Sequence, residues 1–441
     1  MLYLIYLRKH PAHRSFYMEL SRFLLMNDSV SVLTISEFRD VGDIWLGKCL
    51  YDKCSSQGNI PNMDLFSIYY RCRFLRSIGW DKALDLMSRM SNYINHILLT
   101  LKPKVVIGPL VDNYTLDILE FLCKQYGIIY VSFSGHLFNG YSRINSRGEY
   151  NYFPRTVNDN EVSCVLDKIT KDSYVPNFHD RLKVSHFSKL CFFYREWLKR
   201  NLFNIYKYYY KDKYNYHYNT VNNWPIYDCN NYINRKREHD LFCHVDEIEY
   251  SDRNILFPLH LTPEATVDYW VEDPLYAFCY LDKIRYVIEN STSNTVFLIK
   301  EHPAMYCLRN KHFYEELLRY DNVKLIHPLD SSNLLLSKVK YVFTENGSIG
   351  IEALLRDKIV IANSVSYYSS LHPNLKMSDL VTDELLSLDI ENYDNRLFVR
   401  DVLQGLFKSQ LYNDNNILKS DFDLIYKNVS VYINYKLSLC K

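Results

Sequence analysis

The second half of the chain alternates short apolar runs with segments of helical spacing, and this pattern constrains the fold most strongly. Apolar runs begin at Asn254, Thr295, Val323, Val339 and Ile359. Each is short enough for a strand and is followed by a segment typical of a helix or a tight turn. Because a helix carries the chain back to begin the next strand in the same direction, such alternation favours a parallel sheet. We therefore predict a doubly wound α/β domain over residues 251–410.

The first half of the chain opens with the same alternation. Strands are predicted at residues 2–7, 30–35, 105–108 and 128–133, with helices between them. This is the beginning of a βαβ arrangement. The predicted fold class is thus α/β, with two doubly wound Rossmann-like domains that face a central cleft, the first over residues 1–180.

Glycine is rare in this chain, and its placement marks one loop. Only 12 of the 441 residues are glycine, and the chain after Gly148 contains just Gly347, Gly350 and Gly405. Two of these lie in TENGSIGIEALL, between a predicted strand and a helix predicted to begin at Ile349. A tight turn into a helix presents unpaired amides and the positive end of the helix dipole, which together favour a phosphate. An ordinary βα turn is the alternative. The predicted phosphate-binding residues are Asn346, Gly347, Ser348 and Ile349.

A second group of polar residues follows the apolar run TVFLI, which ends in Lys300, Glu301, His302 and Pro303. Ligands of open α/β sheets bind at the carboxyl ends of strands, where these side chains emerge. Lys300 suits a phosphate as a point charge, and His302 can donate to one or act as an acid near neutral pH. Pro303 prevents the strand from continuing. The alternative is a solvated loop with an incidental histidine.

Other predicted strands also end in polar residues. His260 and Glu264 follow the strand that begins at Asn254, and a further histidine, His327, follows the one that begins at Val323. In the first domain, Asp112 follows residues 105–108 and His136 follows residues 128–133, so we predict that both face the cleft. Asp112 could instead cap the next helix, and His136 could be a loop residue without a role.

Composition excludes several classes of protein. The formal net charge is +1, so no general attraction to nucleic acid is expected. The 11 cysteines contain no CxxC pair, and no metal-ligand cluster is evident, so we expect reduced thiols and no metal. No apolar run approaches the ~20 residues of a membrane span, and the N-terminus MLYLIYLRKH lacks the order of a signal peptide. We expect a cytoplasmic protein.

The middle and the end of the chain depart from the α/β pattern. Residues 181–250 are predicted to be a helical connector, because glycine disappears and basic and aromatic residues such as Arg195, Lys199 and Lys207 gather. A basic aromatic face on an anionic membrane surface is the alternative interpretation. Residues 411–441 end in an apolar helical pattern that is predicted to pack back on the first domain.

Three segments together resemble a known family. PLHLTPEATVDYW, FLIKEHP and TENGSIGIEALLRDKIVIANSVSYY are similar to the C-terminal half of capsule polysaccharide biosynthesis proteins, the group that includes the Kdo transferases of bacterial capsule assembly. The similarity covers about residues 254–370, and KPKVVIGPLVDNYTLDIL is also similar to such proteins.

The resemblance implies a GT-B glycosyltransferase that moves a sugar from a nucleotide donor onto a growing capsule or lipopolysaccharide. It places His302 and Pro303 on donor phosphate, Gly347 and Ser348 in the phosphate loop, and Glu352 on the ribose. Glu352 could instead complement the helix dipole. Glu345 and Glu352 are one residue closer than the pair typical of retaining GT-B enzymes, so the stereochemistry stays open.

The predicted site therefore has a donor half and a catalytic half. Asp112, His136 and His302 are the predicted catalytic residues, with the acceptor hydroxyl entering from the first domain. The predicted co-substrates are a nucleotide-sugar and a glycan or lipid-linked glycan, without a further cofactor and with peripheral contact to the inner membrane. A nucleotide-sugar epimerase is the alternative function, and a non-catalytic assembly partner is a third class. The predicted donor-binding residues are His260, Glu264, Lys300, Glu301, His302, Pro303, Asn346, Gly347, Ser348, Ile349 and Glu352.

Overall fold

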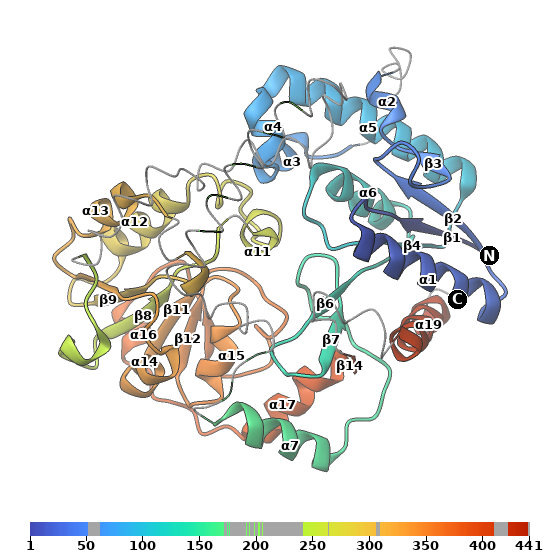
Figure 1. The fold of residues 1–441 in the computed structure, drawn as a ribbon. Helices are drawn as coiled ribbons and strands as arrows, with labels where there is room; N and C mark the ends of the chain where they lie inside the picture. Colours follow the sequence, from blue (N-terminus) through green and yellow to red (C-terminus); the bar gives the residue numbers. More distant parts are fainter. Residues whose placement is uncertain are drawn as a thin grey trace. The chain divides into compact units, whose positions relative to one another are not determined.

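A computed structural model describes residues 1–51, 62–171, 241–262, 264–305, 309–409 and 422–439, with a few isolated positions between 174 and 205. The chain forms two compact units (Figure 1). The first contains Met1–Thr156 and the chain from Leu403 onward, and the second contains the described residues from 241 to 402 together with helix α7 (Asp159–Ile169). Most of the predicted connector, residues 181–250, lies outside the described residues, including its basic aromatic stretch.

A five-stranded parallel sheet with the order β3-β2-β1-β4-β5 forms the centre of the first unit. Its strands are β1 (Leu2–Tyr6), β2 (Ser31–Ser36), β3 (Ile44–Trp45), β4 (Val105–Ile107) and β5 (Ile129–Val131). The helices are α1 (Pro11–Asn27), α2 (Lys48–Tyr51), α3 (Leu65–Arg71), α4 (Arg73–Ile78), α5 (Trp80–Leu101) and α6 (Tyr114–Gln125). Because β1 and β4 lie side by side although they are not consecutive, the winding reverses direction between them.

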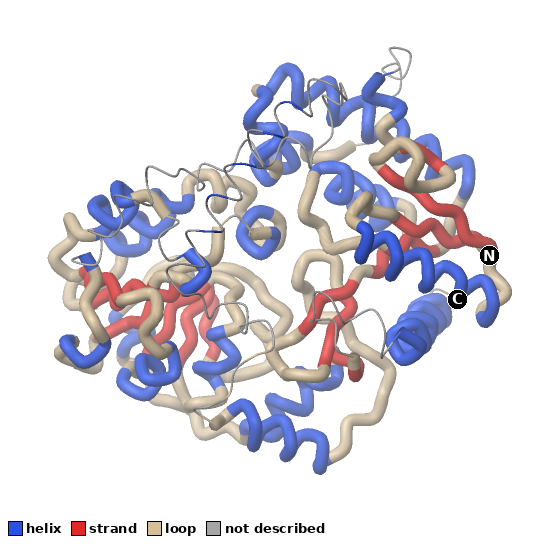
Figure 2. The backbone as a smooth tube through the Cα atoms, viewed as in Figure 1, coloured by secondary structure: helices blue, strands red, loops and turns tan. Residues whose placement is uncertain are grey.

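The second unit repeats this plan with a six-stranded parallel sheet of order β10-β9-β8-β11-β12-β13, drawn in red in Figure 2. The strands are β8 (Asn254–Pro258), β9 (Val296–Lys300), β10 (Val323–Ile326), β11 (Tyr341–Thr344), β12 (Ile359–Ala362) and β13 (Leu375–Met377). The helices are α11 (Ala265–Asp268), α12 (Tyr280–Asn290), α13 (Lys311–Leu317), α14 (Ser332–Lys338), α15 (Ile349–Leu354), α16 (Asp383–Leu386) and α17 (Asn395–Gln404), with short 3-10 turns η5 (Val245–Glu247) and η6 (Pro303–Met305).

Both faces of the second sheet are covered, which explains its continuous apolar strands. Phe257 and Ile299 belong to a core cluster that also contains residues of α12 and α13. Leu256 and Leu298 point to the opposite face and are fully buried as well. Side chains alternate between the faces of a strand, so burial of both sets requires helices on both sides. The predicted α/β class with two Rossmann-like domains is confirmed.

A small antiparallel sheet completes the first unit and corrects one prediction. It consists of β6 (Phe133–Gly135), β7 (Tyr141–Ile144) and β14 (Leu406–Lys408). The predicted single strand at residues 128–133 is therefore wrong at its end, because β5 stops at Val131 and Phe133 belongs to β6. Continuous apolar residues cannot reveal at which residue a chain leaves one sheet for another.

Helix α12 begins at Tyr280, six residues after Pro274. Asp273 holds the intervening residues in turns, because its side chain accepts a hydrogen bond from the Leu275 amide at 2.9 Å and its carbonyl accepts one from the Tyr276 amide at 3.1 Å. An aspartate that bonds the backbone two residues ahead competes with helix formation.

The C-terminal helix α19 (Phe422–Leu439) packs on α1, and the two lie next to each other in Figure 1. Ile425, Val429 and Ile433 are buried in the core of the first unit. Ser430 donates to the Asp28 carboxylate at the end of α1, at 2.7 and 2.9 Å. The last described helix is therefore part of the first unit.

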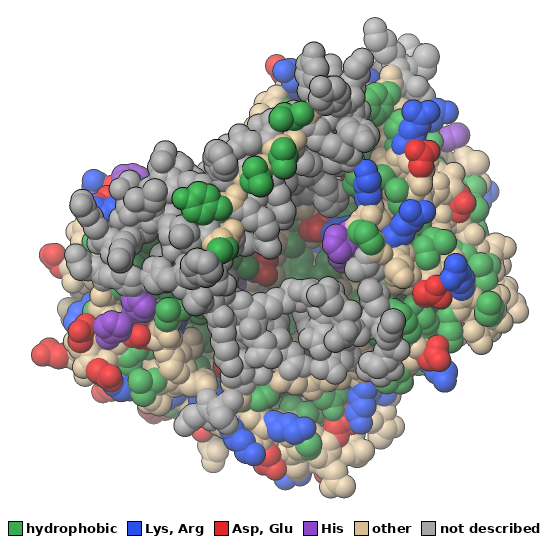
Figure 3. Space-filling model, viewed as in Figure 1, with side chains coloured by type: hydrophobic (Ala, Val, Ile, Leu, Met, Phe, Trp, Pro, Cys, Tyr) green, Lys and Arg blue, Asp and Glu red, His purple; other side chains and the backbone are tan. Residues whose placement is uncertain are grey.

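On the face shown in Figure 3, acidic and basic side chains of the described residues are interspersed, in keeping with the net charge of +1. Among the described residues, no helix has both the length and the apolar character that a bilayer crossing requires.

The packing of α19 yields a prediction with a control on the same helix. Val429 is fully buried, whereas 45% of Val431 is exposed. Val429→Ala should lower the free energy of unfolding by about 2 kcal/mol, since it leaves a cavity in the core. Val431→Ala should change it by no more than about 0.5 kcal/mol. Denaturant unfolding measures both, and equal losses would show that α19 does not pack as described.

Candidate functional site

The candidate site of the second unit lies where the winding of its sheet reverses, between β8 and β11. The loop after β8 leads to His260 and α11, and the loop after β11 leads to Glu345 and α15. Strand β9 lies on the other side of β8, so its loop is roughly 10 Å from that of β11 at a strand spacing of about 4.8 Å. Ligands of doubly wound sheets bind at such a reversal.

A buried carboxylate and imidazole join the two central loops. His260 Nε2 lies 2.8 Å from Glu345 Oε2, and the Tyr276 hydroxyl donates to Glu345 Oε1. Burial by itself would lower the pKa of His260, but the Glu345 carboxylate outweighs burial and raises the pKa above its ordinary value. The pair thus favours an imidazolium at the floor of the site.

Gly350 leaves no room for a Cβ unless Tyr368 moves, and the space at Gly347 is tight. A Cβ at Gly350 would lie 2.3 Å from the Tyr368 hydroxyl, and one at Gly347 would lie 3.2 Å from Thr344 Oγ1 and 3.4 Å from His260 Cε1. Tyr368 donates to the Gly347 carbonyl at 2.5 Å, which fixes the turn. At Gly350 it is therefore a tyrosine of the protein that approaches the backbone closely.

The turn keeps unused backbone donors beside these contacts. The Gly350 and Ile351 amides donate to the Gly347 and Ser348 carbonyls, each at 3.1 Å. Within the described part of the chain, the amides of residues 347–349 have no partner. Helix α15 begins at Ile349, as predicted, but has only six residues, so its dipole adds little. Any anion bound here would depend on the individual amides.

Two side chains of the same turn carry polar atoms without partners. Asn346 Nδ2 donates to the Thr266 carbonyl at 2.9 Å and ties the turn to α11. Its Oδ1 atom and Thr344 Oγ1 are buried and have no hydrogen-bond partner among the described residues. Buried polar atoms are seldom left unsatisfied, and a bound ligand or water would satisfy them.

Glu301, the second residue of the KEHP segment, is held inside the protein. Its Oε2 atom accepts from Arg309 Nε at 2.6 Å and from the Tyr314 hydroxyl at 2.7 Å. Arg309 also donates to the His260 carbonyl at 2.8 Å and to Thr262 Oγ1 at 3.0 Å. Arg309 thereby joins the loops after β8 and β9, and Glu301 holds that clamp rather than contacting a ligand.

Lys300 likewise points into the protein, which corrects its predicted place on a phosphate. The side chain is 3% exposed, and its Nζ donates to the Pro328 carbonyl at 2.9 Å in the loop after β10. Burial lowers the Lys300 pKa to about 8. The residue is the last of β9, and its side chain reaches the loop after β10, which lies on the opposite side of β9 from β8 and β11.

The remaining residues predicted for the donor lie nearer to solvent. His302 is half-buried, and its amide donates to Glu301 Oε1. Pro303 begins the turn η6. Glu264 is exposed, and its carboxylate accepts a hydrogen bond from the Thr266 hydroxyl. Glu352 is half-buried in the first turn of α15, and its carboxylate has no partner among the described residues. Burial raises the Glu352 pKa to about 7, partly offset by Arg356.

In the first unit, Asp112 lies at the equivalent reversal of winding. It follows β4, and its carboxylate pairs with Arg8, which follows β1. One third of the Asp112 side chain is exposed, compared with 13% of Arg8. Asn113, not Asp112, caps α6, because Asn113 Oδ1 accepts from the Leu116 amide at 2.9 Å. The capping alternative for Asp112 is therefore wrong.

His136 does not lie at this reversal. It follows β6 in the small antiparallel sheet and is 5% exposed, with Nδ1 accepting from the Phe138 amide at 3.0 Å. Burial, aided by Arg143, holds the pKa of His136 well below its ordinary value. Because the apolar run before His136 divides between two sheets, His136 follows a strand of the small sheet and not of the parallel one, and its place beside Asp112 stays a prediction.

Sequence reasoning missed the residues that hold the second-unit site together. Glu345 directly follows a predicted strand and could have been selected by the same argument as His302. Tyr276, Arg309 and Tyr368 carry no local signal, since their partners lie 69, 8 and 21 positions away along the chain. A metal was not predicted, yet in the described part of the chain one group of three potential ligands occurs, His244, His327 and Asp330.

The Arg309 clamp yields a prediction about charge burial. Arg309→Met should lower the free energy of unfolding by about 3–5 kcal/mol, because it leaves Glu301 buried without its cation. The exposed pair Arg253–Asp383, with atoms 2.7 Å apart, provides the control, and Arg253→Met should cost less than about 1 kcal/mol. Adding Glu301→Gln to Arg309→Met should recover part of the loss. If the double variant unfolds as easily as Arg309→Met alone, the loss of stability comes from packing and not from the buried charge.

The raised pKa of Glu352 yields a prediction about pH. A folded-state pKa of about 7 against an ordinary value of 4.5 means that the folded state binds the proton more tightly. This contribution to stability is complete below pH 4.5 and is lost as pH rises through 7. The difference in unfolding free energy between Glu352→Gln and the parent should therefore shift in favour of the variant by up to about 3 kcal/mol between pH 4.5 and pH 8. A pH-independent difference in unfolding free energy would contradict the assignment.

Comparison with solved structures finds proteins of low identity. KpsC of Thermosulfurimonas dismutans, a beta Kdo 2,7 transferase, has 12% identity and a TM-score of 0.34, covering 84% of this chain and 98% of that one. The beta Kdo 2,4 transferase of the same organism has 11% identity and a TM-score of 0.33, covering 68% and 79%. A UDP-GlcNAc 2-epimerase from Methanocaldococcus jannaschii has 14% identity and a TM-score of 0.24, covering 99% and 100%. No curated protein matches the chain.

Comparison with family models gives a match that includes the strand ends described above. The model of the capsule polysaccharide biosynthesis protein matches residues 197–371, which end in the loop that carries Tyr368. The segments FLIKEHP and TENGSIGIEALL lie within it. Over residues 197–371 the chain is similar to the capsule polysaccharide biosynthesis protein family.

Proposed function

We propose that this protein is a glycosyltransferase of surface polysaccharide assembly, which moves a sugar from a nucleotide-sugar onto a capsule or lipopolysaccharide glycan. The observation that carries the proposal is the turn after β11, where the amides of residues 347–349 have no partner at the reversal of the sheet. A diphosphate has the charge and the oxygen acceptors to occupy such donors. The family match over residues 197–371 supports the same assignment.

The donor half of the proposed site has three parts. The 347–349 amides and the half-buried His302 would hold the phosphates. The imidazolium favoured by the His260–Glu345 pair would add positive charge beneath them. Glu352, which has no partner among the described residues, would accept hydrogen bonds from ribose hydroxyls. The amides of residues 347–349 and the Glu352 carboxylate would thereby gain partners that the described residues do not provide.

Transfer would proceed by breaking the bond between the sugar's anomeric carbon and the phosphate oxygen. The acceptor hydroxyl oxygen forms the new bond to that carbon, and its proton passes to Asp112 of the first unit. The nucleotide leaves with the bonding electron pair, and its negative charge meets the 347–349 amides and His302. Arg8 would hold the Asp112 carboxylate in place as base. Asp112 suits this role better than His136, because one third of the Asp112 side chain is exposed whereas His136 is 5% exposed.

Two finer statements belong to this proposal. Transfer needs no metal, since amides and imidazoles at the turn could meet the phosphate charge, and an unchanged rate in EDTA would support this. The protein works in the cytoplasm with peripheral contact to the inner membrane, which rests on the predicted basic segment around Arg195 and Lys199 outside the described residues. Its partners are the donor and a glycan or lipid-linked acceptor, and not nucleic acid.

The nucleotide-sugar epimerase alternative is separated by incubating the protein with the donor alone. CMP-, UDP- and GDP-sugars that raise the melting temperature would first identify the donor. A transferase then releases nucleotide and extends a glycan only when acceptor is added. An epimerase changes the sugar configuration without acceptor, and that result would replace the proposed function.

His302→Ala tests the donor half directly. We expect transfer to fall by about 100-fold or more, since a group that stabilises the leaving phosphate acts mainly in the transition state. His312, an exposed histidine on α13, provides the matched control, and His312→Ala should keep the parent rate. Circular dichroism would verify that both variants are folded. Full activity of a folded His302→Ala protein would refute the role of His302.

A further inference from the structure

Three side chains gather at the outer edge of the second sheet, two strands away from the β8–β11 reversal. His327 directly follows β10, and Asp330 lies three residues later, where its amide donates to the His327 carbonyl at 3.1 Å. His244 belongs to a segment that runs parallel to β10, with Cys243 bridged to Ile326. Backbone pairing therefore fixes all three positions.

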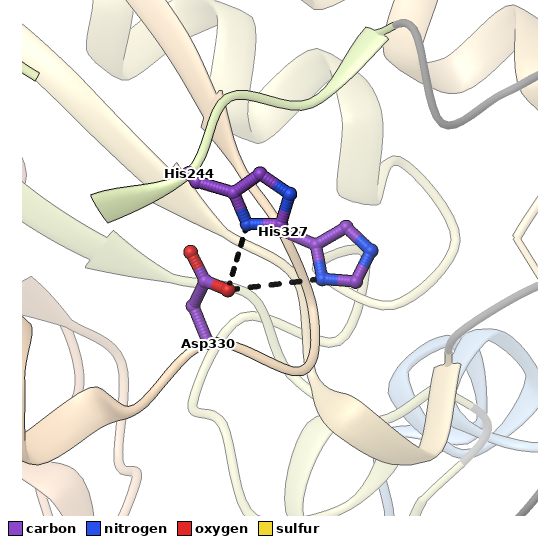
Figure 4. A group of neighbouring side chains, drawn as sticks. All are labelled: His244, His327 and Asp330. Atoms are coloured by element: carbon purple, nitrogen blue, oxygen red, sulfur yellow. Dashed lines mark hydrogen bonds and ion pairs between the residues drawn. The ribbon is translucent and has the colours of Figure 1, made fainter. Parts of the chain in front are cut away.

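The ring nitrogens converge on one carboxylate oxygen (Figure 4). His244 Nδ1 lies 3.1 Å from Asp330 Oδ1, and His327 Nδ1 lies 3.9 Å from the same oxygen. One ligand atom from each residue lies within 4.8 Å of the others. Bonds of about 2.0–2.1 Å in tetrahedral geometry place ligand atoms about 3.4 Å apart, and the two distances lie on either side of this spacing.

The surroundings leave one oxygen and one open side for an ion. Asp330 Oδ2 accepts from the Val245 amide at 2.9 Å, which orients the carboxylate and leaves Oδ1 directed at the imidazoles. His327 is 8% exposed, whereas the His244 side chain is 58% exposed, so an ion can enter from solvent. The Leu329 amide lies 3.3 Å from His327 Nδ1, a long hydrogen bond that a metal would replace.

We propose that His244, His327 and Asp330 form a binding site for one divalent transition-metal ion of the zinc type. Two imidazoles and one carboxylate are ligands that suit zinc, and three protein ligands leave a fourth position for water. The ion joins the segment before η5 to the loop between β10 and α14. Its ligands His244 and Asp330 are 86 positions apart along the chain. Its role is to stabilise this edge of the unit, because an ion that binds only the folded state raises stability. The site is independent of the proposed transfer reaction.

The test uses the full-length protein, stripped of metal with a chelator, and Zn²⁺ titrated against a chromophoric competitor. His244→Ala removes an exposed ligand, and Asp330→Asn removes a charge while keeping an oxygen for the Val245 amide. Each should weaken Zn²⁺ binding by at least about 100-fold, since changes outside the ligand sphere already cost 10–100-fold. The control is His312→Ala, because His312 Nδ1 lies 3.8 Å from Glu316 without a third ligand, and it should bind as the parent does.

Two further readouts separate this site from binding elsewhere. Co²⁺ should give a visible spectrum of nitrogen and oxygen ligands, without the near-ultraviolet charge-transfer band of a thiolate. Zn²⁺ should raise the melting temperature of the parent and of His312→Ala, but not that of His244→Ala. Any of three results would overturn the proposal: both ligand variants bind Zn²⁺ as tightly as the parent, the Co²⁺ spectrum contains a thiolate band, or the parent does not bind Zn²⁺.

Discussion

The strand order of the second sheet governs everything else in this unit. With β8 and β11 side by side, their loops leave the sheet in opposite directions, and the space between them must be closed by side chains or by a ligand. In this protein the His260–Glu345 contact joins the loops after β8 and β11, and Arg309 holds the loop after β8 through the His260 carbonyl. The turn above the floor keeps donors and acceptors that the protein does not use.

Two buried carboxylates, Glu301 and Glu345, illustrate how this edge tolerates charge. Each is almost completely buried, and each has a cation and a tyrosine hydroxyl as partners, Arg309 with Tyr314 and His260 with Tyr276. Desolvating a carboxylate costs several kcal/mol unless its oxygens are satisfied. Such arrangements specify loop geometry more than they add stability, and here they hold the loops on which the turn at residue 347 depends.

The fold could be predicted from the sequence because its signal is local. Apolar runs of strand length, broken by turns, predicted nine of the eleven described parallel strands, whereas the short edge strands β3 and β13 were missed. TENGSIG predicted the start of α15. The direction in which a side chain points depends on strand alternation and on distant partners, which no local pattern contains. Lys300 and His302 are two residues apart in one motif, yet Lys300 is clamped in the interior and His302 is half-buried near solvent. Clusters such as His244 with Asp330 join segments far apart in sequence and were invisible for the same reason.

The first unit is assembled from segments that lie on both sides of the second unit in the sequence, because β14 pairs with β7 and α19 packs on α1. During synthesis, the ribosome releases β1 to β7 long before it releases these last elements. The nascent first unit must therefore wait with an open core and an unpaired β7 edge while the whole of the second unit emerges. The second unit is the one that can finish folding first, so the order of completion is the reverse of the order of translation.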